Sequence, residues 1–298
     1  MYFSRATIAL AAASLAAAAP VEKRAEINDA TILNYALTLE HLEDTFYREG
    51  LQKFTEQQFT DAGFDSTFYA NLKKVSKDES DHVSFISTAL KAAGATPVEA
   101  CKYDFGYKDV NTFLATASIL EGVGVSAYLG AAADIMSKTY LTAAGSILTV
   151  EARHSSYLRS QLKESPYPQA FDAPLTYNEV YSLASGFITS CPESNPALPV
   201  KAFPALTLDP EAGEVKTGST VTLLTPDYTL KGDEGVTIYA AFIAVTGPTF
   251  VEAKPVDGGF SVEIPEGFAG QTYAVLTSCK DSVSDDTVAA GPAIIEIS

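Results

Sequence analysis

Two short stretches decide the fold of this chain: residues 76–85, SKDESDHVSF, and residues 149–157, TVEARHSSY. Each places a glutamate three residues before a histidine, in a chain that has 3 histidines. On an α-helix, residues three apart lie on one face about a turn apart. If both stretches are helical, each directs a carboxylate and an imidazole to one point. The pairs are Glu79 with His82 and Glu151 with His154.

The sequence around both stretches has the pattern of long helices. From about residue 28 to residue 164, apolar residues recur every three or four positions, alanine and leucine are common, and prolines are nearly absent. Asn28 or Asp29 is expected to cap the first helix, and Gly50 to end it. The pattern predicts four long helices and a shorter fifth, at 29–50, 65–93, 110–138, 140–163 and 176–189.

The lengths of the connections predict the topology. Only a residue or two separate the third and fourth predicted helices, so these two are antiparallel neighbours. About 14 residues separate the second and third, and at ~3.3 Å per residue they can run the full ~30 Å length of a bundle. A long middle connection between two hairpins predicts a four-helix bundle of ferritin-like topology.

After about residue 195 the composition changes. Pro, Gly, Thr and Val become frequent, and runs such as TVTLL (220–224) and TYAVLTSC (272–279) alternate or are β-branched, with turn residues between them. We expect a small antiparallel β domain here, arranged as a sandwich. The predicted chain is therefore an α+β multidomain protein, with a ferritin-like bundle at 25–195 and a β-sandwich-like domain at 196–298.

The first 24 residues are expected to be removed. MYFSRATIALAAASLAAAAP has Arg5, then an apolar stretch, then small residues, which is the pattern of a secretory signal peptide. The next residues, VEKR, end in the basic pair Lys23-Arg24, which predicts propeptide processing and a mature start near Ala25; an exposed basic pair without processing is the alternative. The protein is thus expected to be secreted and extracellular, either free or held at the cell wall.

Composition and charge exclude several functions. The 298 residues are 47% hydrophobic, enough for two cores. A net charge of −17 argues against nucleic acid as a partner, because the phosphates would be repelled. The N-terminal apolar run is too short for a transmembrane helix, and no later segment is expected to reach the length that a bilayer requires. The 3 cysteines allow one disulfide, in any of three pairings, and leave one thiol over.

Two further glutamates lie in apolar settings on the other two long helices. They are Glu40 in LTLEHLEDTFY and Glu121 in SILEGVGVSAYLG, and each has a tyrosine seven residues later, Tyr47 and Tyr128 respectively. Seven residues make two helical turns, so each glutamate shares a face with its tyrosine. The tyrosines are then either plain core aromatics or hydrogen-bonding partners of a site.

Four glutamates and two histidines in this order are the donor set of a carboxylate-bridged dimetal site. A single Glu-x-x-His is usually a solvated pair on a helix, so the prediction rests on the whole set. Buried carboxylates are unfavourable alone, whereas two divalent cations neutralise four negative charges. Oxygen and imidazole ligands suit iron or manganese, with zinc also possible, and two divalent metal ions, iron first, are expected. The predicted ligands are Glu40, Glu79, His82, Glu121, Glu151 and His154.

Two neighbours of Glu40 need separate treatment. Glu43 lies one turn along the helix and is an alternative ligand; the match between Glu40 and Glu121 favours Glu40. His41 points about 100° away from Glu40, so it is expected at the surface or behind the ligands.

These motifs resemble a known family. LNYALTLEHLEDTFYREGL (33–51), the two Glu-x-x-His phrases and the C-x-Y-x-F run that begins at Cys101 are similar to secreted ferritin-like proteins of fungi, of the stress-response or late-sexual-development type, which are related to plant desiccation-related proteins. The resemblance covers about residues 28–195. It implies the same six metal ligands. It also implies a disulfide between Cys101 and Cys191, because the SCP run near residue 190 belongs to the same pattern.

Two functions fit this sequence. The first is a diiron oxidoreductase with oxidase or ferroxidase-like chemistry on O2 or peroxide, used in stress response or development. The second is a non-enzymatic cell-surface or matrix scaffold, or a stress protectant. There the metal is structural or vestigial and the β domain binds cell-wall polymer or another partner. The sequence leaves the metal, the substrate and the oligomeric state open.

Overall fold

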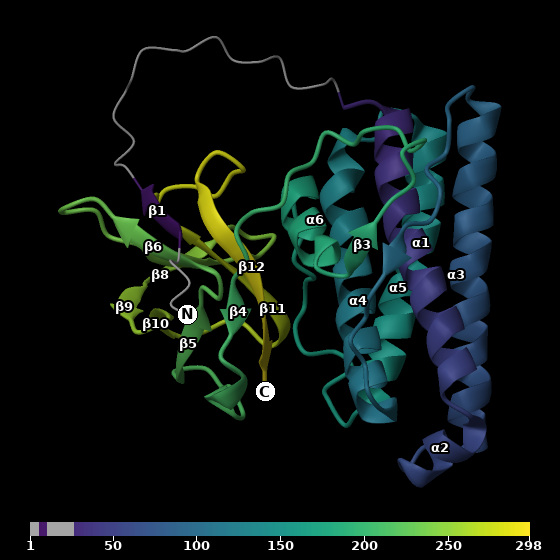
Figure 1. Cartoon of the computed structure of the whole chain (residues 1–298), viewed down its shortest axis with the longest axis horizontal. Coiled ribbons are helices and arrows are strands. Elements are labelled where there is room, and N and C mark those ends of the chain that lie inside the picture. The colour runs from purple at the N-terminus through teal and green to yellow at the C-terminus, as the bar shows by residue number, and fades with distance from the viewer. Residues whose placement is uncertain (1–5, 11–26) are drawn as a thin grey trace. The chain divides into compact units, whose positions relative to one another are not determined.

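The computed structural model describes residues 6–10 and 27–298, which divide into two compact units (Figure 1). The helical unit contains 27–166 and 184–199; the β unit contains 6–10, 167–183 and 200–298. Of the predicted signal peptide and propeptide, only 6–10 are described, and the processing site near Ala25 lies outside the described residues. The domain boundaries at 24/25 and 195/196 stay predictions.

Four long helices run alongside one another in the helical unit (Figure 1). They are α1 (Asp29–Lys53), α3 (Ser66–Ala92), α4 (Val110–Ala131) and α5 (Lys138–Gln161). The shorter helices of this unit are α2 (Glu56–Asp61) and the 3₁₀ turn η1 (Ala132–Asp134), whereas α6 (Tyr177–Ser185) lies mostly in the segment 167–183 of the β unit. Each long helix begins at a side chain that accepts a hydrogen bond from the backbone N–H three residues on, namely Asn28, Asp65, Asp109 and Ser137.

Several helix ends differ from the prediction, and α6 ends at Ser185 instead of residue 189. α1 continues past Gly50 because this glycine is a packing position: a Cβ there would lie 2.1 Å from the ring of Phe113 on α4. The third predicted helix ends at Ala131 instead of residue 138, so its connection to α5 is longer than predicted. The carboxylate of Asp29 holds this connection to the start of α1, accepting hydrogen bonds from the backbone N–H groups of Met136 (2.8 Å) and Ser137 (2.9 Å).

The connection between α3 and α4 runs along α1. The side chain of Asn34, near the start of α1, donates to the carbonyl of Thr96 (3.0 Å) and accepts from the N–H of Val98 (2.8 Å). At the end of α1, Lys53 Nζ donates to the carbonyl of Tyr107 (2.8 Å). Because the connection spans the bundle from one end to the other, α3 and α4 point the same way, as the ferritin-like topology requires.

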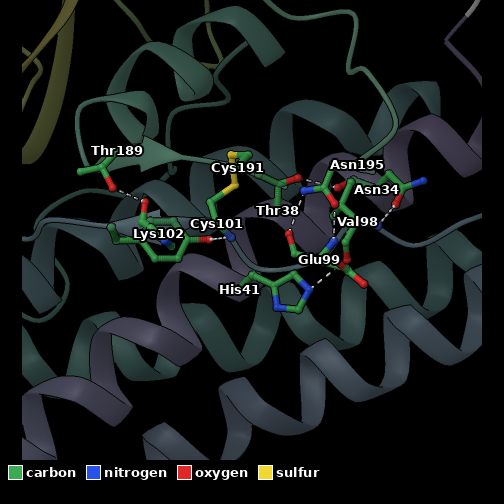
Figure 2. The surroundings of a disulfide bond; sticks show 11 residues. Asn34, Thr38, His41, Val98, Glu99, Cys101, Lys102, Thr189, Cys191 and Asn195 are labelled. Carbon is green, nitrogen blue, oxygen red and sulfur yellow. Dashed lines mark hydrogen bonds between the residues drawn. A yellow bond between two sulfur atoms is a disulfide. The ribbon is translucent and has the colours of Figure 1, made fainter. Parts of the chain in front are cut away.

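A disulfide fastens this connection to the segment after α6 (Figure 2). It joins Cys101 to Cys191, the pair that the family resemblance implies, with a Cα–Cα distance of 4.2 Å. Beside it, strand β2 (Lys102–Tyr103) pairs with β3 (Ile188–Ser190) in antiparallel register. His41 lies here too, with Nε2 3.1 Å from the carbonyl oxygen of Val98.

α4 is the most apolar helix of the bundle. The span Val110–Asp134 is, among the described residues, the one helix long and apolar enough to cross a membrane by length and composition. This corrects the expectation that no segment reaches that length. In the structure, 61% of its apolar window is buried, and Glu121 in its middle is buried as well. Packing between α1 and α5 is therefore the physical reason for its composition.

The β unit contains two four-stranded antiparallel sheets, with strand orders β4-β5-β10-β9 and β12-β11-β7-β8. Phe260 and Leu223 from the first sheet share one core with Phe242, Leu276 and Ile295 from the second, as in a sandwich. The strands are β4 (Thr207–Leu208), β5 (Thr220–Leu224), β7 (Tyr239–Phe242), β8 (Thr249–Glu252), β9 (Lys254–Val256), β10 (Gly259–Glu263), β11 (Gly270–Thr277) and β12 (Val288–Ile297). In addition, β1 (Ala6–Leu10) pairs in parallel with β6 (Tyr228–Gly232), and η2 (Pro210–Ala212) is a 3₁₀ turn.

Candidate metal centre

The six predicted ligands converge inside the bundle. All four long helices contribute: Glu40 from α1, Glu79 and His82 from α3, Glu121 from α4, and Glu151 and His154 from α5. The four glutamates are at most 1% exposed, and the histidines at most 9%. The Glu-x-x-His pairs are therefore not the solvated surface pairs that each would be taken for alone.

Their donor atoms form two overlapping groups. One contains Glu40, Glu79, His82 and Glu151, and the other contains Glu79, Glu121, Glu151 and His154. Within each group, one donor atom from every residue lies within 4.8 Å of all the others. Glu79 and Glu151 belong to both groups, which is the position of carboxylates that bridge two cations.

The carboxylate oxygens are divided between the two histidines. His82 Nδ1 lies 3.2 Å from one oxygen of each glutamate in its group. His154 Nδ1 lies 3.0 Å from Glu79 Oε1 and 3.3 Å from Glu121 Oε2. Because Glu79 turns Oε2 to His82 and Oε1 to His154, this one carboxylate faces both groups.

The two tyrosines cross between helices to hold the outer carboxylates. Tyr47 on α1 donates its hydroxyl hydrogen to Glu121 Oε1 on α4, and Tyr128 on α4 donates to Glu40 Oε1 on α1. In each carboxylate the other oxygen, Oε2, then faces a histidine. Of the two sequence interpretations, the structure thus brings both tyrosine hydroxyls onto the predicted ligands.

Glu43 is also buried at the centre. It is 4% exposed but belongs to neither donor group. It lies beside Gly124, where a Cβ would come within 3.2 Å of both Glu43 Oε1 and Glu151 Oε2. Gly124 therefore makes room for carboxylates.

Asp78 is a residue that the sequence reasoning missed. Its Oδ2 lies 3.3 Å from His154 Nε2, on the opposite side of the imidazole ring from the Nδ1 that faces the glutamates. The signal was its position immediately before Glu79, but an exposed acid on an amphipathic helix is ordinarily a surface residue.

Burial and mutual repulsion shape the protonation of the cluster. Burial first, and then the neighbouring carboxylates, raise the pKa of Glu43 and Glu151 well above the usual range and the pKa of Glu79 to about 7. For His154, burial alone would lower the pKa, but the carboxylates of Glu121 and Glu79 outweigh it and raise the pKa to about 11. Without a cation, protons therefore carry the compensating positive charge.

The donor set fits divalent cations. Five buried carboxylate oxygens of the centre lack a well-aligned hydrogen bond: Glu40 Oε2, Glu79 Oε1, Glu121 Oε2 and both oxygens of Glu151. Four of them have a histidine Nδ1 within 3.3 Å as their ion-pair partner, and two imidazoles serve four glutamates. So many buried carboxylates with so few positive partners are costly. These are the atoms that turn toward the two groups, and oxygen and imidazole donors suit iron, manganese or zinc.

The helical region matches a known protein family. Residues 28–164 match the ferritin-like domain family. Protein rds1 of Schizosaccharomyces pombe is 28% identical over 176 residues, covering 59% of this chain and 43% of that protein, so the chain spans less than half of the relative's length. A solved structure, the conserved hypothetical protein rv2844 from Mycobacterium tuberculosis, aligns with a TM-score of 0.38 at 18% identity, covering 48% of this chain and 96% of the other. The helical region 28–164 is thus ferritin-like, and antiparallel sheets follow it.

Proposed function

We propose that the helical unit holds two divalent cations, iron before manganese or zinc, and acts as an oxidoreductase of the oxidase or ferroxidase type. The observation that carries this is the pair of overlapping donor groups sharing Glu79 and Glu151. When bound, a pair of iron ions supplies one-electron chemistry toward O2 or peroxide. The proposed ligands are Glu40, Glu79, His82, Glu121, Glu151 and His154.

The chain's own residues orient the ligands. The hydroxyl of Tyr128 occupies one oxygen of Glu40, and the hydroxyl of Tyr47 occupies one oxygen of Glu121, which leaves a single oxygen of each carboxylate turned inward. Both rings are buried, so they cannot swing away without opening the core. The tyrosines therefore fix each outer carboxylate in one binding mode.

Protons must leave the histidines when cations bind. Because the pKa of His154 is raised to about 11, this imidazole is protonated at neutral pH in the absence of a cation. Its Nδ1 faces Glu79 and Glu121, so binding a cation there displaces the proton from Nδ1. Cation uptake is accordingly expected to release protons to the solvent.

The surroundings of the centre are apolar on the side of Tyr128. A small apolar pocket lies against the ring of Tyr128 and is lined by residues of all four long helices, including Ile32, Ile86 and Ile147. Low polarity strengthens each charge interaction inside the cluster.

The disulfide is consistent with an oxidising compartment, and we place the proposed activity outside the cell, in stress response or development.

The burial of the donors also suits a second function, a non-enzymatic scaffold in which the cations are structural. Glutamates that are at most 1% exposed and histidines that are at most 9% exposed hold a cation firmly but leave little room for a large substrate. In that case the β unit carries the interaction with a wall polymer or another partner.

The test measures metal content and turnover on the purified chain. Elemental analysis is expected to give two iron atoms per chain after anaerobic loading, and each further addition of Fe²⁺ with O2 or peroxide is expected to be oxidised, with the added Fe²⁺ as the electron donor. Glu79→Gln and Glu151→Gln remove a shared carboxylate and should abolish both results, whereas Glu56→Gln, at an exposed position on α2, should change neither. Two bound atoms without turnover would support the scaffold; no bound metal would refute the dimetal centre itself.

A further inference from the structure

The two halves of the centre match in their ligands. Each group has three carboxylates and one imidazole, so their charges are equal. Each outer glutamate accepts a hydrogen bond from a tyrosine of the opposite helix. The number and type of the ligands therefore do not distinguish the two cation positions.

The two donor groups differ at the Nε2 atom of their histidines, which points away from the carboxylates of the group. His154 has Asp78 at its Nε2, at 3.3 Å, and Asp78 directly precedes Glu79 in α3. The corresponding residue before Glu151 in α5 is Val150, whose side chain has no hydrogen-bonding atom. Across the part of the chain that the structure describes, no side chain or carbonyl is found as partner of His82 Nε2, and the His82 side chain is 11% exposed.

A carboxylate behind a histidine acts on the metal through the ring. It accepts the Nε2 hydrogen, which fixes the tautomer with the lone pair on Nδ1, holds the ring plane, and makes the ligand more basic. At His154, this Nδ1 is the atom that faces Glu79 and Glu121. At His82, the carboxylates of the group hold the ring through Nδ1 alone.

We infer that the two cation positions are inequivalent and fill in order, with Asp78 as the positioning residue that sets the order. The group of Glu79, Glu121, Glu151 and His154 takes the first cation, and the group of Glu40, Glu79, His82 and Glu151 takes the second. This inference rests on the proposed dimetal function. Loss of such an outer carboxylate typically weakens metal binding about 10–100-fold. Because the Asp78 side chain is 49% exposed, the effect belongs near the lower end, at about 10-fold.

The test removes the carboxylate at position 78 and introduces one at position 150. Calorimetric titration of the metal-free protein with Zn²⁺ should give two steps that differ about 10-fold in affinity. Asp78→Val should weaken the first step about 10-fold so that the two steps merge, and Asp78→Asn, which keeps an acceptor without the charge, should weaken it less. Val150→Asp should strengthen the second step. Asp81→Val is the matched control, because Asp81 lies on the same helix, its side chain is 62% exposed, and its ion-pair partner is the exposed Lys77.

A second readout identifies the position that fills first. With one equivalent of Co²⁺, the NMR signals of the His154 ring should shift more than those of the His82 ring. The double variant with Asp78→Val and Val150→Asp should reverse this difference. Melting temperatures verify that each variant is folded. Two bound cations of equal affinity, unaffected by Asp78→Val, would overturn the inference and leave the dimetal centre standing. A protein that binds no cation would overturn both.

Discussion

Glu40 and Glu43 lie one turn apart on α1 and are both buried, yet their surroundings differ. Glu40 accepts the hydroxyl of Tyr128 and faces His82, which places it in a donor group. Glu43 lies beside Gly124 and outside both groups. The geometry thus favours Glu40 as the ligand. The sequence favours the same residue, because Glu40 and Glu121 each have a tyrosine seven residues later.

A pair of isosteric substitutions tests this distinction. Glu40→Gln removes one negative charge from the donor group that contains His82 and should lower the bound metal from two atoms per chain to one. Glu43→Gln should retain two, because no donor group loses a carboxylate. Elemental analysis at saturating metal decides; a loss of metal in Glu43→Gln equal to that in Glu40→Gln would assign Glu43 as a ligand too.

At the residue scale, helical spacing was sufficient to select the six residues that the structure brings together. The offset of three, the tyrosine spacing and the order of the helices are all local properties. The contact of Asp78 with His154 is different, because it joins α3 to α5 across the bundle. Sequence spacing within one helix carries no information about such a contact.

At the element scale, the packing of α1 on α4 depends on Gly50. The ring of Phe113 occupies the space where a Cβ would stand, and this ring is fully buried and stacked on Phe46 with centroids 4.7 Å apart. Phe113 therefore has little freedom to move aside.

Gly50→Ala is expected to destabilise the protein by about 1–3 kcal/mol through overpacking. Gly145→Ala is the matched control, because Gly145 lies within α5 and a Cβ there meets nothing within 4 Å. The control should be neutral or raise the stability by up to about 1 kcal/mol, since alanine favours helix. Chemical denaturation measures both; equal stability of Gly50→Ala and the unchanged protein would contradict the packing argument.

The same glycine shows where element prediction fails. A glycine near the end of a helical pattern usually marks the helix end, so Gly50 was expected to stop α1. The helix continues to Lys53 because tertiary packing, and not backbone conformation, selects glycine there. Likewise, the fifth helix was predicted to continue to residue 189 but ends at Ser185, and residues 188–190 form β3 because they pair with β2 from a distant part of the chain.

At the scale of the whole molecule, the disulfide joins cysteines separated by 90 residues. A cross-link over so long a loop restricts the unfolded chain strongly. Replacing both Cys101 and Cys191 by alanine should therefore lower the stability by about 2–5 kcal/mol. Cys279→Ala is the control, because this thiol is free. Thermal unfolding without reductant measures the difference, and equal melting temperatures for the two variants would contradict the expectation.

The order of a helical region followed by an antiparallel β region could be predicted from the sequence, because hydrophobic periodicity and turn residues change abruptly near residue 195. The division into compact units could not. Residues 167–183 group with the β unit and 184–199 with the helical unit, and this alternation depends on contacts between residues far apart in the chain.

The Cys101–Cys191 bond also affects what happens to the protein when a protease cleaves the chain. It closes a ring of chain that contains α4 and α5, and with them Glu121, Glu151 and His154. The ring also contains strongly exposed aromatic residues after α5, Tyr167 at 82% and Phe171 at 65% exposure, where digestion would begin. A single cut there leaves both fragments covalently joined, so a nicked molecule can retain its complete set of donor side chains.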